Sequence, residues 1–170
     1  GEPLELFWIL DDIGSAEALV AKRSSGIKTI ADLKGKKIAM PFNSTTHFHT
    51  MVALDQWKIN PADVQILNMR PPEVRAAWQG GDIQATFIWD PVLAEVKKDG
   101  KVIITSGQIS AETGKATFDG YVANKDWAKA NRDFTMSSSD RDGEMTTSAP
   151  RIAAASQRSS VAISSPPSPS

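Results

Sequence analysis

The sequence predicts an α/β fold in which helices cover a mostly parallel sheet. Short apolar segments of strand length alternate with helical segments along residues 4–105, and prolines and glycines mark several of the boundaries. Parallel strands need crossover connections of a dozen or more residues, which a helix usually provides. The alternation therefore indicates a sheet with helices packed against it.

The first elements are predicted from apolar runs and capping residues. Residues 4–10 and 17–23 are expected to be strands, and the first is a nearly continuous apolar run, which is typical of a strand buried on both faces. A short helix is expected at residues 29–35, with Thr29 as its N-cap, Asp32 in its first turn and Gly35 at its end. Residues 36–40 then form the next strand.

A helix at residues 46–57 has the clearest periodicity. Met51, Leu54 and Trp57 share one face, with Phe48 and Val52 at its edge. Beyond this helix, prolines at helix starts and Gly80-Gly81 at a helix end divide the chain further. Strands are predicted at 64–69, 83–89 and 101–105, and helices at 71–79 and 91–100.

Composition excludes several classes of protein. The net charge is −1 and the basic residues form no stripe, so nucleic acid is not expected as a partner. The absence of cysteine excludes disulfides and zinc–thiolate sites but leaves the cellular compartment open. Residues 1–10 resemble neither a secretory signal nor a membrane span. Residues 135–170 are rich in Ser and Pro, lack aromatic side chains and are expected to be disordered.

The segment between residues 40 and 46 is a candidate anion site. It connects the end of a strand to the start of a helix, where free N–H groups and the helix dipole favour negative charge. Ser44, Thr45 and Thr46 add three hydroxyl donors, which suit a carboxylate, sulfonate or phosphate. Ordinary N-capping by Ser44 would explain the same residues without a ligand.

Other polar residues near strand ends give weaker signals. His47 and His49 lie two apart on a helix, on roughly opposite sides, so no shared metal is expected. Trp89 and Asp90 follow a strand at the edge where α/β folds bind ligands, although Trp89 could equally belong to the core. Asp119 lies in an otherwise apolar strand and is expected to meet a cation, either a lysine or a ligand.

Several segments together resemble the taurine-binding proteins of bacterial ABC importers, within the taurine, aliphatic sulfonate and nitrate type of solute-binding family. The most specific are STTH at 44–47, NMRPPEVRAAWQGGDI at 68–83 and WDP at 89–91, and they occur in order with SAEALVAKR at 15–23 and FDGYVANKDW at 118–127. The resemblance covers nearly all of residues 1–134. It implies a type II periplasmic-binding fold with one lobe nearly complete and the other fragmentary, as in a protein truncated at both ends.

The resemblance also implies a function and a set of contacts. A periplasmic, monomeric protein of sulfur metabolism would capture taurine or a related sulfonate and deliver it to a membrane permease, without cofactor or catalysis. By position, Ser44, Thr45 and Thr46 would bind the sulfonate, Asp119 the ammonium, and Trp89 would form a wall of the cleft. Glu17, His47 and Asp90 are further candidates for contacts with the ligand.

The resemblance further implies a division of the chain and leaves two alternatives. Residues 1–23 would be hinge-proximal strands of the first lobe, 24–117 the second lobe, 118–134 a crossover strand with the start of a helix, and 135–170 a tail unlike the family. A small-molecule-sensing effector domain of a transcriptional regulator would use the same architecture. An enzyme of thiamine pyrimidine synthesis is disfavoured by the absence of cysteine.

Overall fold

The computed structural model describes residues 3–132, in two compact units. The larger unit is Ile13–Thr117, and the described part of the other consists of the N-terminal residues up to Asp12 with the residues from Phe118 onward. The predicted tail at 135–170 lies outside the described residues. The first boundary falls between Asp12 and Ile13, earlier than the one expected after residue 23, because the strand that begins at Glu17 joins the sheet of the larger unit.

A five-stranded mixed sheet forms the centre of the larger unit, with strand order β4-β3-β5-β2-β6. The strands are β2 (Glu17–Lys22), β3 (Lys37–Met40), β4 (Gln65–Asn68), β5 (Ala85–Trp89) and β6 (Gly100–Thr105). Strand β3 pairs in parallel with β4 and β5, whereas β2 runs antiparallel to both β5 and β6. Four of the five strands therefore run in one direction, as predicted for a mostly parallel sheet, and β2 is the exception, inserted against the direction of its neighbours.

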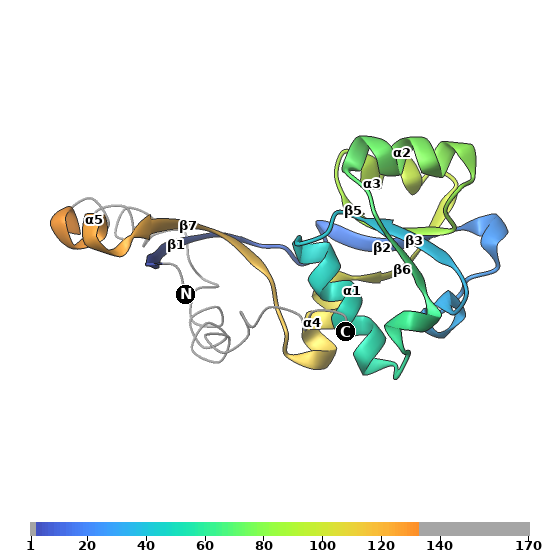
Figure 1. The fold of residues 1–170 in the computed structure, drawn as a ribbon, viewed down its shortest axis with the longest axis horizontal. Helices are drawn as coiled ribbons and strands as arrows, with labels where there is room; N and C mark the ends of the chain where they lie inside the picture. The colour runs from blue at the N-terminus through green and yellow to red at the C-terminus, as the bar shows by residue number, and fades with distance from the viewer. Residues whose placement is uncertain (1–2, 133–170) are drawn as a thin grey trace. The chain divides into compact units, whose positions relative to one another are not determined.

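Helices cover both faces of this sheet (Figure 1). Helices α2 (Pro71–Gly80) and α3 (Val92–Val96) lie on one face, and α1 (Thr45–Gln56) and α4 (Ser106–Thr113) on the other. Short 3-10 helices occupy Arg23–Ser25, Ile30–Leu33 and Pro61–Asp63. The one at Ile30–Leu33 is the short helix predicted from its cap, since Thr29 and Asp32 form a capping box.

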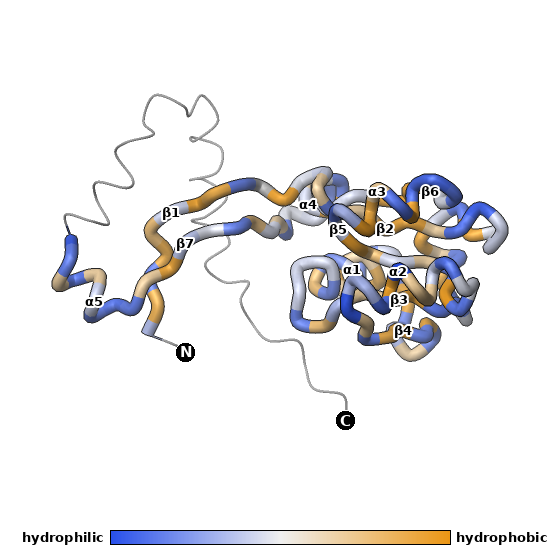
Figure 2. Tube along the Cα trace, turned by 90° about the horizontal axis from the view of Figure 1, so that it is seen from above, coloured by the Kyte–Doolittle hydropathy of each residue, from blue (hydrophilic) through white to orange (hydrophobic). Residues whose placement is uncertain are grey.

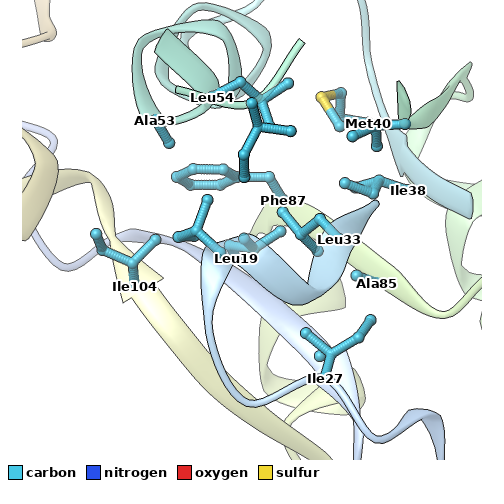
Figure 3. Packing of buried hydrophobic residues seen from close by; sticks show 14 of the residues in the cluster. Leu19, Ile27, Leu33, Ile38, Met40, Ala53, Leu54, Ala85, Phe87 and Ile104 are labelled. Atoms are coloured by element: carbon cyan, nitrogen blue, oxygen red, sulfur yellow. The ribbon is translucent and has the colours of Figure 1, made fainter. Parts of the chain in front are cut away.

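The two faces have separate apolar cores, and β2 and β5 contribute to both. Along β2, Ala18 and Val20 pack under α2 and α3, whereas Leu19 and Ala21 pack under α1 and α4. This alternation follows from the two-residue period of a strand. Phe87 of β5 lies between Leu54 of α1 and Leu19 of β2 (Figure 3).

Two details of the elements differ from the sequence prediction. Helix α4 was not predicted, because its SGQISAET sequence has few apolar residues. In α1 the buried face is polar as well as apolar, and Met51 and Trp57, expected at its centre, are only partly buried. The buried residues of α1 are Thr46, His49, Thr50, Val52, Ala53 and Leu54.

The smaller unit contains a two-stranded antiparallel ribbon of β1 (Leu4–Asp12) and β7 (Phe118–Asn124), followed by α5 (Lys125–Ala130). Hydrophobic residues run along β1 as they do along β5 (Figure 2), but Leu4 and Leu10 have 48% and 54% of their surface exposed. The expectation that residues 4–10 are buried on both faces is thus not met among the described residues. No helix among residues 3–132 is both long and apolar enough to cross a membrane.

Candidate functional site

One edge of the five-stranded sheet collects most of the predicted site residues. Strands β3 and β5 are parallel and both end there, and the antiparallel β2 begins there, with Glu17 in register with Trp89. Because β6 also runs antiparallel to β2, its last residue, Thr105, pairs with Ala18 at the same edge. Open α/β sheets bind ligands outside the carboxyl ends of their parallel strands, so this is the edge of interest.

The three hydroxyl residues begin α1, and their protons are used within the protein. Ser44 is the N-cap: its hydroxyl donates to the carbonyl oxygen of Pro41 at 2.6 Å and accepts from the N–H of His47 at 3.3 Å. The Ser44 and Thr46 hydroxyl oxygens are 2.8 Å apart. Because the single hydroxyl proton of Ser44 is donated to Pro41, Thr46 is the donor of this hydrogen bond. The hydroxyl of Thr45 donates to Glu17.

The donors that remain at this helix start are backbone amides. Ser44 caps only the amide of His47, and the hydrogen bonds found among residues 3–132 include no acceptor for the amides of Thr45 and Thr46. These two amides belong to the orphan donors of a helix N-terminus, where the helix dipole adds a partial positive charge. The arrangement can therefore accept an anion through its backbone, as the sequence predicted, while Ser44 also caps the helix.

Glu17 is the most deeply buried acidic group of the edge, with 4% of its surface exposed. One carboxylate oxygen accepts from Thr45 and the other accepts from the hydroxyl of Ser106 at 3.0 Å. Ser106 also lies 2.8 Å from Nδ1 of His49, whose Nε2 is 3.2 Å from the carbonyl oxygen of Lys115. Glu17 is thus joined to the predicted anion site, and Ser106 and His49 are added to its surroundings.

His47 lies beside the loop that precedes α1. Its ring stacks on Phe42, with ring centroids 4.4 Å apart and planes 5° from parallel, and its Nδ1 accepts from the N–H of Asn43 at 3.4 Å. Partial burial lowers the pKa of His47, because desolvation disfavours the charged imidazolium. Asn68 holds the same loop by accepting from the N–H of Phe42 at 3.0 Å.

Trp89 and Asp90 end the neighbouring strand β5. Trp89 is partly buried and packs against the apolar core under α2 and α3. The exposed Asp90 accepts from the N–H of Ala94 at 2.9 Å, and so stabilises the start of α3. Trp89 and Asp90 therefore each have a structural role, and a contact with a ligand would be a second role.

Asp119 lies on β7, in the smaller unit, and so outside the group at the edge of the sheet. It is exposed and pairs in register with Asp11 of β1. The sequence suggested a costly carboxylate in an apolar strand that would need a cation, but most of β7 is exposed, so water can solvate this carboxylate. Its contact with a ligand remains a prediction.

Within residues 3–132, no three His, Asp or Glu side chains are grouped closely enough to hold a metal ion. Sequence reasoning missed Ser106 and His49 as parts of the site. Ser106 follows β6 at the favoured edge, so its position after a predicted strand was an available signal. The burial of His49 could not be seen, because polar residues on a helix are ordinarily assigned to the exposed face.

The chain is similar to several known binding proteins. The chain is 43% identical over 127 residues to the taurine-binding periplasmic protein of Escherichia coli, covering 75% of this chain and 39% of that protein. It is 34% identical over 120 residues to a putative aliphatic sulfonates-binding protein of the same organism, covering 70% and 36%. The crystal structure of the E. coli periplasmic aliphatic sulphonate binding protein SsuA matches with a TM-score of 0.70 and 29% identity, over 81% of this chain and 46% of that one.

These matches confirm the predicted family resemblance and the fold class. The chain has the α/β fold of periplasmic binding proteins and covers part of it, spanning less than half the length of each of these relatives. None of these three relatives is a regulator, so they do not support the effector-domain alternative. Residues 13–137 match the family described as NMT1/THI5 like, which is most of the chain. The chain therefore belongs to the NMT1/THI5-like family.

Proposed function

We propose that this chain is a solute-binding component of an ABC importer and captures taurine or a related sulfonate. The observation that carries the proposal is the start of α1, where two amides without an internal acceptor and three hydroxyls lie at the ligand-binding edge of the sheet. The 43% identity to a taurine-binding protein supports the choice of taurine as the anion for this site. The proposed setting is the periplasm, and the proposed partner is the membrane permease.

The sulfonate would be bound mainly by backbone groups. The amides of Thr45 and Thr46 provide donors that require no rearrangement, and the helix dipole favours the negative charge. The hydroxyls of Ser44, Thr45 and Thr46 donate to protein oxygens in this structure, so each must rotate before it can donate to a sulfonate.

The ammonium group of taurine needs an acidic or aromatic partner. We assign this role to Asp119, which is exposed and forms no ion pair with a lysine, arginine or histidine among residues 3–132, and we assign Trp89 to the wall of the cleft. Glu17 already accepts from two hydroxyls, so we give it the role of supporting Thr45. His47 supports the loop before α1, and Asp90 supports the start of α3.

Such a protein acts by binding and release, without chemistry of its own, cofactor or nucleic acid, and we propose that it works as a monomer. Binding proteins of this kind close around their solute, so contacts from the remainder of the fold add to those described here. Because the chain spans 39% of its E. coli relative, affinity must be measured with and without that remainder.

Calorimetric titration of taurine tests the proposal, with sulfate and ethanesulfonate as competing anions. It is run on this chain and on a chimera in which residues 13–117 replace the homologous segment of the E. coli protein. Taurine binding by the chimera, lost when Thr45-Thr46 is replaced by Ala-Pro to remove two hydroxyls and an amide, supports the proposal. A chimera that folds and binds no sulfonate refutes it. Binding of ethanesulfonate with equal affinity would retain the sulfonate site but remove the ammonium contact.

A further inference from the structure

A buried series of hydrogen bonds joins α1, β2 and α4 behind the proposed anion site. It runs from Thr45 through Glu17, Ser106 and His49 to the carbonyl oxygen of Lys115. Glu17, His49 and Ser106 have 4%, 0% and 1% of their surface exposed. Burying an ionisable group costs free energy unless the group is paired, so the protonation states of Glu17 and His49 determine whether this series is stable.

The acceptors fix how many protons the series holds. The carbonyl oxygen of Lys115 can only accept, so Nε2 of His49 must carry a hydrogen. Ser106 has a single hydroxyl proton and two neighbours, the carboxylate of Glu17 and Nδ1 of His49. Whichever neighbour receives that proton, the other must carry a proton of its own to complete its hydrogen bond. The series is therefore a carboxylate with an imidazolium, or a carboxylic acid with a neutral imidazole.

The contacts of Glu17 favour the charged form. Its two oxygens face the hydroxyls of Thr45 and Ser106, and donation by two hydroxyls favours the ionised carboxylate. Thr45 also has no competing acceptor among the hydrogen bonds of residues 3–132. Ser106 then accepts from His49, which is an imidazolium separated from the carboxylate by one hydroxyl.

Other ionisable groups on the surrounding elements are too solvated to replace this pairing. Their side chains are exposed or only partly buried, so water screens them. On α1, α4, β2, β3 and β6 these groups are His47, Asp55, Glu112, Lys22, Lys37 and Lys101, while Asp90 follows β5 and Lys115 follows α4.

We propose that His49 is a positioning residue of the anion site: as an imidazolium bridged by Ser106, it keeps Glu17 ionised, and Glu17 anchors the side chain of Thr45 so that the backbone amides of Thr45 and Thr46 face the anion. The effect of His49 on sulfonate binding rests on the proposed function, because Thr45 is one of the residues assigned to the sulfonate. The ionic pairing itself does not depend on any ligand. His49 contacts no ligand in this scheme and acts only through Ser106 and Glu17.

Nitrogen NMR of the imidazole rings tests the pairing on the full chain. The chain has two histidines, so an H47N variant assigns both rings. A doubly protonated ring gives two similar nitrogen shifts, whereas a neutral ring gives two widely separated ones. At about pH 7.5, above the ordinary imidazole value of about 6.5, His49 is expected to show the doubly protonated pattern and His47 the neutral one.

Replacing Glu17 by Gln distinguishes the two proton arrangements. The amide can accept from Thr45 and donate to Ser106, which then donates to Nδ1, so every hydrogen bond remains while His49 becomes neutral. The expected result is a change of His49 to the neutral pattern in E17Q, with E112Q on α4 as the exposed control that leaves it unchanged. A neutral His49 in the unaltered chain, with the same spectrum in E17Q, overturns the proposal.

A rescue experiment tests the positioning role. H49F leaves the carboxylate of Glu17 without its counter-charge, and taurine affinity should fall about tenfold. Combining H49F with E17Q removes that buried charge and should recover most of the loss. Equal losses in H49F and the double variant would show that only the ring's shape matters and would overturn the positioning role. These affinities are measured in the chimera. If the NMR result holds and neither the chimera nor its variants bind taurine, the proposed function fails and the ionic pairing stands.

Discussion

The hydrogen bond between Ser44 and Thr46 should appear as a measurable coupling in a double-mutant cycle. Replacing Ser44 by Ala removes the N-cap, which costs about 1 kcal/mol. It also removes the acceptor of Thr46, whose side chain is fully buried, and a buried unsatisfied hydroxyl costs about 1–3 kcal/mol. We therefore expect Ser44→Ala to lower the free energy of unfolding by about 2–4 kcal/mol.

Replacing Thr46 by Val is a milder change. Valine keeps the β-branched shape and removes only the donor, so the expected loss is one net hydrogen bond of about 1 kcal/mol. In the double variant no buried hydroxyl remains unsatisfied, and the loss should be about 2 kcal/mol, less than the two single losses combined. The expected coupling is thus about 1–3 kcal/mol.

Urea unfolding followed by tryptophan fluorescence measures all four free energies, since Trp57, Trp78 and Trp89 lie in the larger unit. Thr50→Val is a matched control, because its buried hydroxyl donates to the carbonyl oxygen of Thr46 and makes no contact with Ser44. Additive losses for Ser44 and Thr46, with a coupling below about 0.3 kcal/mol, would refute the hydrogen bond and with it the claim that these hydroxyl protons are used internally.

Three further predictions concern stability. Gly100→Ala should lower the free energy of unfolding in urea by about 1–3 kcal/mol, because a Cβ there would lie 2.4 Å from Cγ1 of Val20. Gly26→Ala is the comparison variant: its Cβ would meet no atom within 4 Å, so at φ +75° it measures the backbone strain alone. Because the pKa of His47 is lower in the folded than in the unfolded protein, its contribution to the free energy of unfolding is fully present above the unfolded-state pKa. That contribution declines as the pH falls from the unfolded-state pKa to the folded-state pKa. In a pH series of melting temperatures, His47→Phe should weaken this loss of stability. Hydrogen bonds from the N–H groups of Lys28 and Thr29 and the Thr29 hydroxyl lower the pKa of Asp32, so the stability lost in Asp32→Ala at neutral pH should disappear as acid titrates the folded carboxyl.

Much of the fold could be predicted because its signals are local. Pro71 begins α2 and Gly81 ends it in the left-handed conformation that glycine favours, while Thr29 and Asp32 form the expected capping box. Strand direction was not predictable in this way. The segment from Glu17 would have the same apolar pattern whether it ran parallel or antiparallel, and its pairing is decided by residues more than sixty positions away.

The candidate site was predictable where it depends on a helix start and not where it depends on burial. The hydroxyls at the start of α1 follow a predicted strand. They are therefore expected at the carboxyl end of that strand, where open α/β sheets bind ligands. The involvement of Ser106 and His49 depends on the packing of α4 against α1, and α4 has too few apolar residues to be recognised. A buried histidine is favourable only when its partners are present, and those partners are distant in sequence.

The position of β2 between β5 and β6 constrains the order in which the larger unit can fold during synthesis. This strand emerges from the ribosome first among the five, but both of its neighbours follow much later, and the second ends only at Thr105. Until β5 is made, β2 has no sheet partner, and until β6 is made its other edge stays unpaired. Such long-range pairing slows folding and leaves an apolar strand open to association. Nascent chains that stop before β6 should therefore depend on chaperones, whereas chains that extend past it can close the sheet.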